Sequence, residues 1–215
     1  MAGLDLVIRG GELVTAGGIA RADVGIAGGT IAQIGGDMAA AREIDAAGKL
    51  VLPGGIDAHV HLSSAPGSAR PPDAPRWVDD FTSGSAAALA GGVTTLGNMS
   101  FLAPGETPLA GLAREQAMAD FFLHPVLGET TPAVLDEIPR LLDHGGNSIK
   151  FFMSTPCFDP QVAGYVEATR RAGDAGLITL IHCEDYALMT DATARLVAAG
   201  RTSFHYYPES RPVIA

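Results

Sequence analysis

The sequence predicts an α/β fold of about five βα units that follows a short β-rich segment. Strand patterns alternate with helical patterns from Pro53 to Gly200, and residues 1–50 contain short β-branched runs separated by glycine turns. Alternation of this kind builds right-handed βαβ units around a parallel sheet. A closed barrel of eight units needs about 250 residues, or about 31 per unit. Residues 53–215 therefore form either an open α/β sheet or the front portion of a longer barrel.

The β-rich segment has a local reason for each strand. The runs LDLVIRGGELV, ADVGIAGGTIAQIG and REIDAAGKLV combine β-branched residues with tight turns, which predicts a small antiparallel sheet. From Leu50 the pattern changes to one longer strand, LVLPGGIDAHVHL, and then to a polar, proline-rich loop from Ser63 to Arg76. We therefore expect two domains, residues 1–50 and 51–215.

Helices and strands follow in turn along the rest of the chain. Caps mark two of the helices: Gly91 and Gly92 end the first, and Thr131 with Pro132 begins the third. The helical patterns are DDFTSGSAAALAGG, a segment near 108–119, TPAVLDEIPRLLDHGG, DPQVAGYVEATRRAGDAG and YALMTDATARLVAAG. The strand patterns are VTTLGNM, DFFLHPVLG, NSIKFFMS and LITLIHCE.

Composition and charge exclude several classes of protein. Apolar residues make up 47% of the chain and charged residues 18%, which allows a sizeable core and argues against disorder. A net charge of −10 without a basic cluster argues against a nucleic-acid partner. No apolar run approaches the roughly 20 residues that span a bilayer, and the N-terminus lacks the features of a signal peptide. With two cysteines only, we expect a reduced, cytoplasmic protein without a membrane partner.

Two histidines end the first long strand. Side chains alternate along a strand, so Asp57, His59 and His61 point to one side. Two imidazoles at i and i+2 can bind one cation, and barrel enzymes build their active sites at this end of the strands. The alternative is that the histidines are ordinary polar residues at a strand end. Asp57 either orients a histidine or simply stabilises the strand.

A lysine and a third histidine lie in later strands. Lys150 stands in the apolar run NSIKFFMS, where it either reaches past its neighbours to solvent or is buried. Burial lowers the pKa of a lysine, and the neutral amine can add carbon dioxide to form a carbamate. His182 ends the strand LITLIHCE. The ends of these strands would converge with His59 and His61 on one barrel mouth, which predicts a metal site.

The remaining candidates are expected to play no direct role. Cys183 points away from His182 by strand alternation. His124 is expected to be structural or to support a ligand, and His144 and His205 are expected to be solvated.

Five blocks of the sequence resemble successive blocks of the cyclic amidohydrolases, in the same order. These blocks are GKLVLPGGIDAHVHL, DDFTSGSAAALAGGVTT, GGNSIKFFMS, LIHCED and ESRP, and the dihydropyrimidinase/D-hydantoinase branch is the most similar. The resemblance covers nearly the whole chain. It implies a (β/α)8 TIM-barrel type of fold, incomplete here, with the N-terminal strands in a small β-sandwich. It also implies a homo-oligomer, commonly a tetramer.

The resemblance implies a reaction and its cofactors. Two divalent metals, usually zinc, would be bridged by a carbamate on Lys150; His59 and His61 match ligands of one metal, and His182 matches a ligand of the other. The implied reaction is hydrolysis of a cyclic amide C–N bond in a dihydropyrimidine, hydantoin or related ring, through a hydroxide that bridges the metals. Lys150 and Asp57 are the residues expected to support catalysis.

Three departures from the family pattern leave alternatives open. Hydantoinases place a tyrosine five residues after the lysine, where this chain has Thr155, so the oxyanion is held otherwise or the substrate differs. Trp77 and the missing tyrosine keep an allantoinase-like activity open, whereas the loop after His61 lacks the arginine of dihydroorotases. The family also uses a histidine of strand six and an aspartate of strand eight, which have no counterpart within the 215 residues.

The chain is therefore expected to be the N-terminal portion of such an enzyme. Alone it would hydrolyse little of a small cyclic amide, and a C-terminal half would complete it. The remaining alternative is a non-catalytic, dihydropyrimidinase-related assembly protein.

Overall fold

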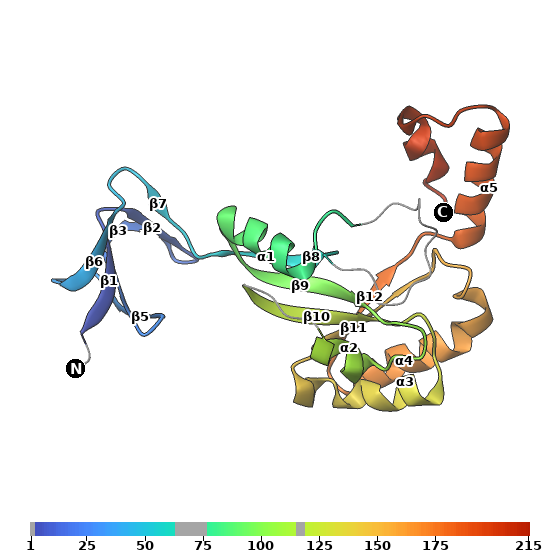
Figure 1. Ribbon diagram of the computed structural model, residues 1–215, viewed down its shortest axis with the longest axis horizontal. Coiled ribbons are helices and arrows are strands. Elements are labelled where there is room, and N and C mark those ends of the chain that lie inside the picture. Colours follow the sequence, from blue (N-terminus) through green and yellow to red (C-terminus); the bar gives the residue numbers. More distant parts are fainter. Residues whose placement is uncertain (1–2, 63–76, 115–118) are drawn as a thin grey trace. The chain divides into compact units, whose positions relative to one another are not determined.

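The computed structural model describes residues 3–62, 77–114 and 119–215 (Figure 1). The loop predicted from Ser63 to Arg76 lies outside these ranges, as do residues 115–118 of the helix expected near 108–119. The chain forms two compact units: a β-rich unit, Met1–Gly55, and an α/β unit, Ile56–Ala215.

The β-rich unit contains two small sheets, with strand orders β5-β4-β1-β6 and β3-β2-β7. Hairpin neighbours pair antiparallel as predicted, but β6 pairs parallel with β1, and β7 pairs parallel with β2. The prediction of a purely antiparallel sheet is therefore wrong, because the last two strands cross over to pair with strands from the start of the chain. The strands are β1 (Leu4–Arg9), β2 (Glu12–Thr15), β3 (Gly18–Arg21), β4 (Val24–Ala27), β5 (Thr30–Ile34), β6 (Ala40–Asp45) and β7 (Leu50–Val51).

The long strand predicted from Leu50 is two strands. The chain leaves β7 at Val51 and enters β8 (Gly55–Val60) only after Pro53 and Gly54. A proline has no N–H to donate to a strand ladder, which explains the interruption.

The α/β unit is built on a curved, five-stranded sheet with the order β12-β11-β10-β9-β8 (Figure 1). The pairs β9–β10, β10–β11 and β11–β12 are parallel, so the predicted α/β class with a parallel sheet is confirmed. The described residues form no closed barrel, and β8 and β12 are the two edges of the sheet. The remaining strands are β9 (Val93–Phe101), β10 (Asp120–Val126), β11 (Ser148–Phe152) and β12 (Ile178–His182).

Helices connect the strands and begin at recognisable caps. Asp80 accepts a hydrogen bond from the Ser83 N–H in a capping box, and the Thr131 hydroxyl caps the third helix as predicted. That third helix is shorter than expected: it gives way to a 3₁₀ turn at Ile138–Arg140, because Pro139 cannot donate the next helical hydrogen bond. The helices are α1 (Phe81–Ala90), α2 (Pro108–Arg114), α3 (Pro132–Glu137), α4 (Val162–Asp174) and α5 (Tyr186–Ala198).

The core lies between the helices and one face of the sheet. Ile149 and Phe151 of β11 pack there against residues of α3, α4 and the segment between them. Strand alternation therefore directs Ser148, Lys150 and Phe152 to the opposite face, here called the inner face. The core cluster comprises Leu127, Val134, Ile138, Leu141, Ile149, Phe151, Tyr165, Ala168, Ala172 and Leu177.

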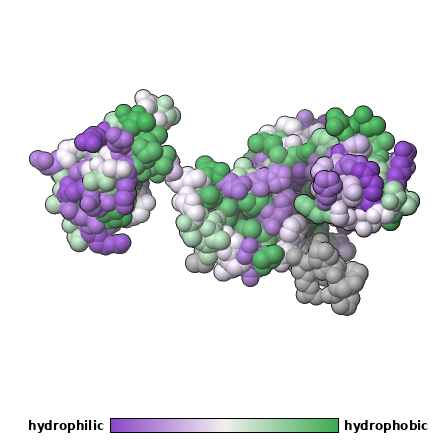
Figure 2. All heavy atoms as spheres, turned by 90° about the horizontal axis from the view of Figure 1, so that it is seen from above, coloured by the Kyte–Doolittle hydropathy of each residue, from purple (hydrophilic) through white to green (hydrophobic). Residues whose placement is uncertain are grey.

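Several large apolar side chains lie on the surface of this unit. Ile178 and Ile181 of the edge strand β12 are 61% and 41% exposed, and Val166 of α4 is 64% exposed. Figure 2 shows hydrophobic residues open to solvent in separate areas of the face that it presents. Among the described residues, no helix is long and apolar enough to cross a membrane.

Candidate active site

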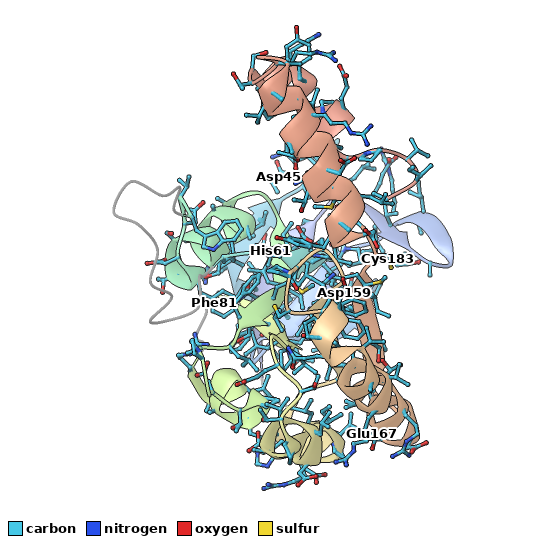
Figure 3. The ribbon with its side chains drawn as sticks, turned by 90° about the vertical axis from the view of Figure 1, so that its right-hand side faces the viewer. Asp45, His61, Phe81, Asp159, Glu167 and Cys183 are labelled. Carbon is cyan, nitrogen blue, oxygen red and sulfur yellow. The ribbon has the colours of Figure 1, made fainter. Side chains whose placement is uncertain are left out.

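Two imidazoles face each other where β8 ends. The Nε2 atoms of His59 and His61 are 3.2 Å apart, so both rings lie on the same side of the strand, as alternation predicts (Figure 3 labels His61). The Asp57 carboxylate accepts a hydrogen bond from the His59 backbone N–H at 3.1 Å. Asp57 thus orders the strand immediately before the histidine pair.

The spacing of the histidine pair suits a shared cation. Two nitrogens bound tetrahedrally to zinc at about 2.0–2.1 Å lie about 3.3–3.4 Å from each other. The observed separation of 3.2 Å is close to this value. The Nδ1 atom of His61 is buried and finds no hydrogen-bond partner within the described part of the chain. In metal-bound histidines, the ring nitrogen that does not bind the metal usually donates a hydrogen bond through its N–H. The His61 ring makes no such hydrogen bond within the described part of the chain.

Lys150 is buried on the inner face, in the middle of β11. Its exposure is 3%, so the alternative in which the side chain reaches solvent is wrong. The Nζ atom lies 4.8 Å from the centre of the Phe152 ring, and no carboxylate among the described residues pairs with it. Burial lowers the pKa of the Lys150 amine, and Cys183 acts weakly in the opposite direction.

His182 lies beside the same aromatic ring. It is paired in register with Phe152, and the two ring centres are 5.3 Å apart. Its Nε2 atom is 2.5 Å from the Glu184 carboxylate, whose other oxygen lies 3.6 Å from Arg211. Glu184 is not among the residues predicted from the sequence. Its position two residues after His182 indicates that the two side chains lie on the same side of an extended chain.

A row of aromatic rings joins these strand ends across the inner face. The ring of Phe101, at the end of β9, is 5.5 Å from His61 and 6.1 Å from Phe152. His61 also lies 5.7 Å from Trp77. The row thus runs from β8 to β12, with His182 at its far end.

The electrostatics of the two histidines agree with this proximity. Burial is the largest cause that lowers the pKa of His59 and of His61. The positive charges of Lys150 and His182 lower both pKa values further, whereas Asp57 raises that of His59. Lys150 and His182 are therefore both within electrostatic reach of His59 and of His61.

The donors do not form a preassembled metal cage. Across residues 3–62, 77–114 and 119–215, no group of three His, Cys, Asp or Glu side chains is arranged to hold a metal ion. His182 is engaged by Glu184, and an unmodified lysine amine is not one of the usual metal ligands.

Known proteins are similar to nearly the whole of this chain. A D-phenylhydantoinase from Escherichia coli O1:K1 is 33% identical over 220 residues, which cover 97% of this chain and 46% of that protein. A D-hydantoinase structure from Bacillus sp. AR9 gives a TM-score of 0.84 at 32% identity, covering 98% of this chain and 47% of that one. An L-hydantoinase (dihydropyrimidinase) from Arthrobacter aurescens gives 0.79 at 27% identity, with coverages of 98% and 48%. No protein-family model matches.

This chain is a relative of the hydantoinases. It spans about half the length of the curated relatives it matches and corresponds to their N-terminal half. The curved parallel sheet and the small β-rich part are similar to the same region of the solved hydantoinases.

Thr155, at the position where the sequence predicts a departure from the hydantoinases, lies in the turn after β11. The Thr155 hydroxyl donates to the Phe152 carbonyl oxygen at 3.3 Å and accepts from the Cys157 thiol. It is therefore folded back toward its own strand. Cys183, His144 and His205 are exposed.

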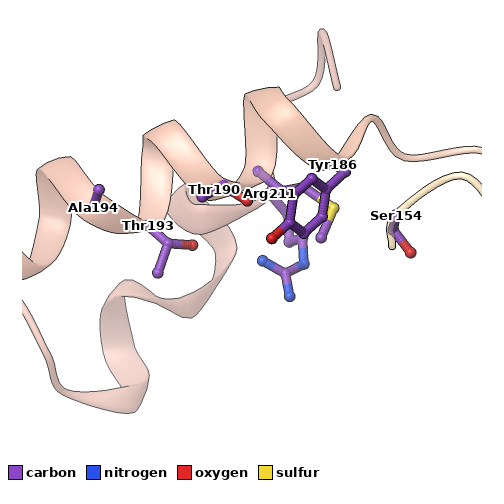
Figure 4. Close-up of a pocket in the computed structure, with 7 residues that line it drawn as sticks. Ser154, Tyr186, Thr190, Thr193, Ala194 and Arg211 are labelled. Atoms are coloured by element: carbon purple, nitrogen blue, oxygen red, sulfur yellow. The ribbon is translucent and has the colours of Figure 1, made fainter. Parts of the chain in front are cut away.

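A pocket of about 380 Å³ lies beside α5 of the hydantoinase relative (Figure 4). None of the four predicted ligands lines it. Its nearest link to them is Arg211, which contacts the Glu184 carboxylate that holds His182. The lining residues are Ser154, Tyr186, Met189, Thr190, Thr193, Ala194 and Arg211.

Proposed function

We propose that this chain is part of a metal-dependent cyclic amidohydrolase that hydrolyses the C–N bond of a hydantoin, dihydropyrimidine or related ring. The observation that carries the proposal is that the His59–His61 pair and a buried Lys150, which has no carboxylate partner among the described residues, lie on one face of the sheet. The similarity to hydantoinases of both D and L type supports the reaction class and leaves the stereochemistry open.

In this proposal the chain supplies donors to two divalent cations, with zinc as the expected metal. His59 and His61 hold one cation, and His182 holds the other. When bound, such ions lower the pKa of a water molecule and polarise the substrate carbonyl. Glu184 must release the His182 Nε2 atom, and the guanidinium of Arg211 is close enough to take over that carboxylate.

Lys150 becomes a ligand through a carbamate. Because burial lowers its pKa, more of the amine is neutral than in an exposed lysine. The lone pair of the neutral amine forms a bond to the carbon of carbon dioxide while one C=O π pair moves onto oxygen, and the nitrogen then releases one proton to solvent. The product carries one negative charge that two oxygens share, which suits a position between two cations.

Thr155 and Asp57 have different supporting roles. Asp57 holds the backbone of His59 and so orients the histidine pair. A rotation of the Thr155 hydroxyl away from Phe152 would let it contact a substrate on the inner face. Because threonine is shorter than tyrosine, this contact suits a substrate other than that of a typical hydantoinase, allantoin among them.

A C-terminal half, either continuous with this chain or supplied by a second polypeptide, completes the assembly in this proposal. The edge strand β12 presents exposed Ile178 and Ile181, and an unpaired, apolar strand edge is a site for strand addition. The added units would close the barrel and supply the remaining ligands and the proton donor. Association into a homo-oligomer, a cytoplasmic location and the absence of a nucleic-acid partner are further expectations of the same proposal.

The experiment is a zinc titration followed by a ring-opening assay. The chain is assayed alone, and then with a separately expressed C-terminal half of a D-hydantoinase, on dihydrouracil, hydantoin and allantoin. We expect zinc binding by the chain and ring opening only with the second polypeptide. A chain that binds no zinc and keeps Lys150 unmodified would instead support the non-catalytic assembly protein.

A further inference from the structure

His124 makes two hydrogen bonds that the proposed function leaves unused. It is buried in β10, with 6% exposure. Its Nε2 atom lies 3.1 Å from the carbonyl oxygen of Ala58 in β8, which is two strands away. A carbonyl oxygen can only accept, so Nε2 carries the proton and donates it. The Nδ1 atom is hydrogen-bonded to the hydroxyl of Ser148 in β11. With both nitrogens engaged, His124 is not available as a metal ligand.

A glycine makes this long-range bond possible. Gly97, in the strand between β8 and β10, has its backbone directly beneath the Ala58 carbonyl. A Cβ atom at Gly97 would lie 2.6 Å from the Ala58 oxygen and 2.7 Å from the Phe122 ring. Both distances are too short for the Cβ atom of any other residue. This position therefore requires glycine because no side chain fits there. Any larger residue would push β8 away from His124.

The two ends of the bridge lie next to the predicted ligands. Ala58 immediately precedes His59, and Ser148 lies two residues before Lys150 on the same inner face. The bridge Ser148–His124–Ala58 therefore connects the strand of the histidine pair to the strand of the lysine. Because β8 is an edge of the sheet, the strand ladder holds it on one side only.

We propose that His124 is a positioning residue, whose bridge from Ser148 to Ala58 fixes β8 and thereby places His59 and His61 relative to Lys150. The inference rests on the proposed function, since this placement matters only if the three residues share a metal centre. The bridge can be removed by a substitution at His124 or Ser148, and neither of these residues is a proposed metal ligand.

The test compares His124→Phe with His124→Gln in the full chain. Phenylalanine keeps a ring but makes neither hydrogen bond, whereas glutamine can donate to Ala58 and accept from Ser148. The metal-free readout is the NMR cross-relaxation between the rings of His61 and Phe101, whose centres are 5.5 Å apart. The second readout is zinc affinity, measured by competition with a chromophoric chelator. His144→Phe is the matched control, because His144 is exposed.

We expect His124→Phe to lose most of the His61–Phe101 signal and to weaken zinc binding about 10- to 100-fold, as for other residues that orient metal ligands. His124→Gln should restore both. A folded His124→Phe protein with an unchanged ring signal would overturn the inference. If His124→Phe does not fold, Ser148→Ala removes one end of the bridge, and an unchanged signal there has the same meaning. Failure of the wild-type chain to bind zinc would overturn the proposed function, while the metal-free signal still decides the role of His124.

Discussion

The Lys150 amine lies 4.8 Å from the centre of the Phe152 ring and has no carboxylate partner among the described residues. A buried cation without a counter-ion is costly, and the electron-rich face of a ring compensates for only part of that cost. The arrangement lowers the pKa of the Lys150 amine. This relationship distinguishes Lys150 from Lys49, the other lysine of the chain, which is exposed.

The two lysines should therefore react differently with carbon dioxide. In ¹³C-labelled bicarbonate at neutral pH, we expect the NMR spectrum of the wild-type chain to contain a carbamate resonance from Lys150, besides any from the N-terminal α-amine. Lys150→Arg should abolish the Lys150 resonance, because the guanidinium stays protonated, and Lys49→Arg should leave it unchanged. Identical carbamate spectra of the wild type and Lys150→Arg would contradict a modified Lys150.

Removal of one histidine of the facing pair should abolish tight zinc binding. We expect His59→Ala to weaken the zinc affinity of the chain by at least about 100-fold, since a direct ligand contributes more than the 10–100-fold of a supporting residue. Competition with a chromophoric chelator measures this change. His144→Ala is the control and should bind zinc as the wild type does. Equal affinities of the two variants would mean that zinc binds elsewhere.

The stability of α4 should depend on pH through Glu167, which lies on the outer side of the unit (Figure 3). Hydrogen bonds from Arg170 and Arg171 lower the pKa of the Glu167 carboxyl to about 2, from an ordinary value of 4.5. A carboxyl with a lower pKa in the folded state stabilises that state above the unfolded pKa. This contribution is full above pH 4.5 and is lost as the pH falls toward 2.

Denaturation of Glu167→Gln and wild type at several pH values tests this dependence. The wild type should be the more stable at pH 7, and the difference should shrink from pH 4.5 downward. It should be small, since the partners are partly exposed and screened by solvent. A difference that stays constant across this range would rule out the carboxylate as its source.

The helix-covered face of the sheet should be much less tolerant of truncation than its edge. Ile149 is fully buried in the core, so Ile149→Ala should lower the free energy of unfolding by about 2–5 kcal/mol. Ile178→Ala, at an exposed edge position, should change it by no more than about 0.5 kcal/mol. Urea denaturation of both variants measures the difference. Comparable losses would place Ile178 in a buried contact.

Much of the candidate site could be predicted because its residues follow local rules. The i, i+2 spacing places His59 and His61 on one side of a strand, and the apolar neighbours of Lys150 indicate its burial. The alternation of strands and helices likewise predicts the parallel sheet. Each of these signals is contained within a few consecutive residues.

Other features depend on curvature and crossing strands, which no short segment encodes. The bond from His124 to Ala58 exists because the sheet curves over Gly97, and the parallel pairing of β6 arises from a crossover. The breaks at Pro53 and Pro139 are different, because both prolines are visible in the sequence. An apolar pattern continues on either side of each proline, so the pattern alone predicts one unbroken strand or helix where the proline interrupts it.

The turn that precedes β7 contains an exposed lysine, Lys49. Lys49 stands just before Leu50, whereas Lys150 is enclosed in the sheet. A lysine-specific protease acting on the native protein thus has a single accessible peptide bond. Cleavage there would cut the chain just before β7, which pairs with β2 of the β-rich unit, so residues 50–215 would separate only after β7 leaves that sheet.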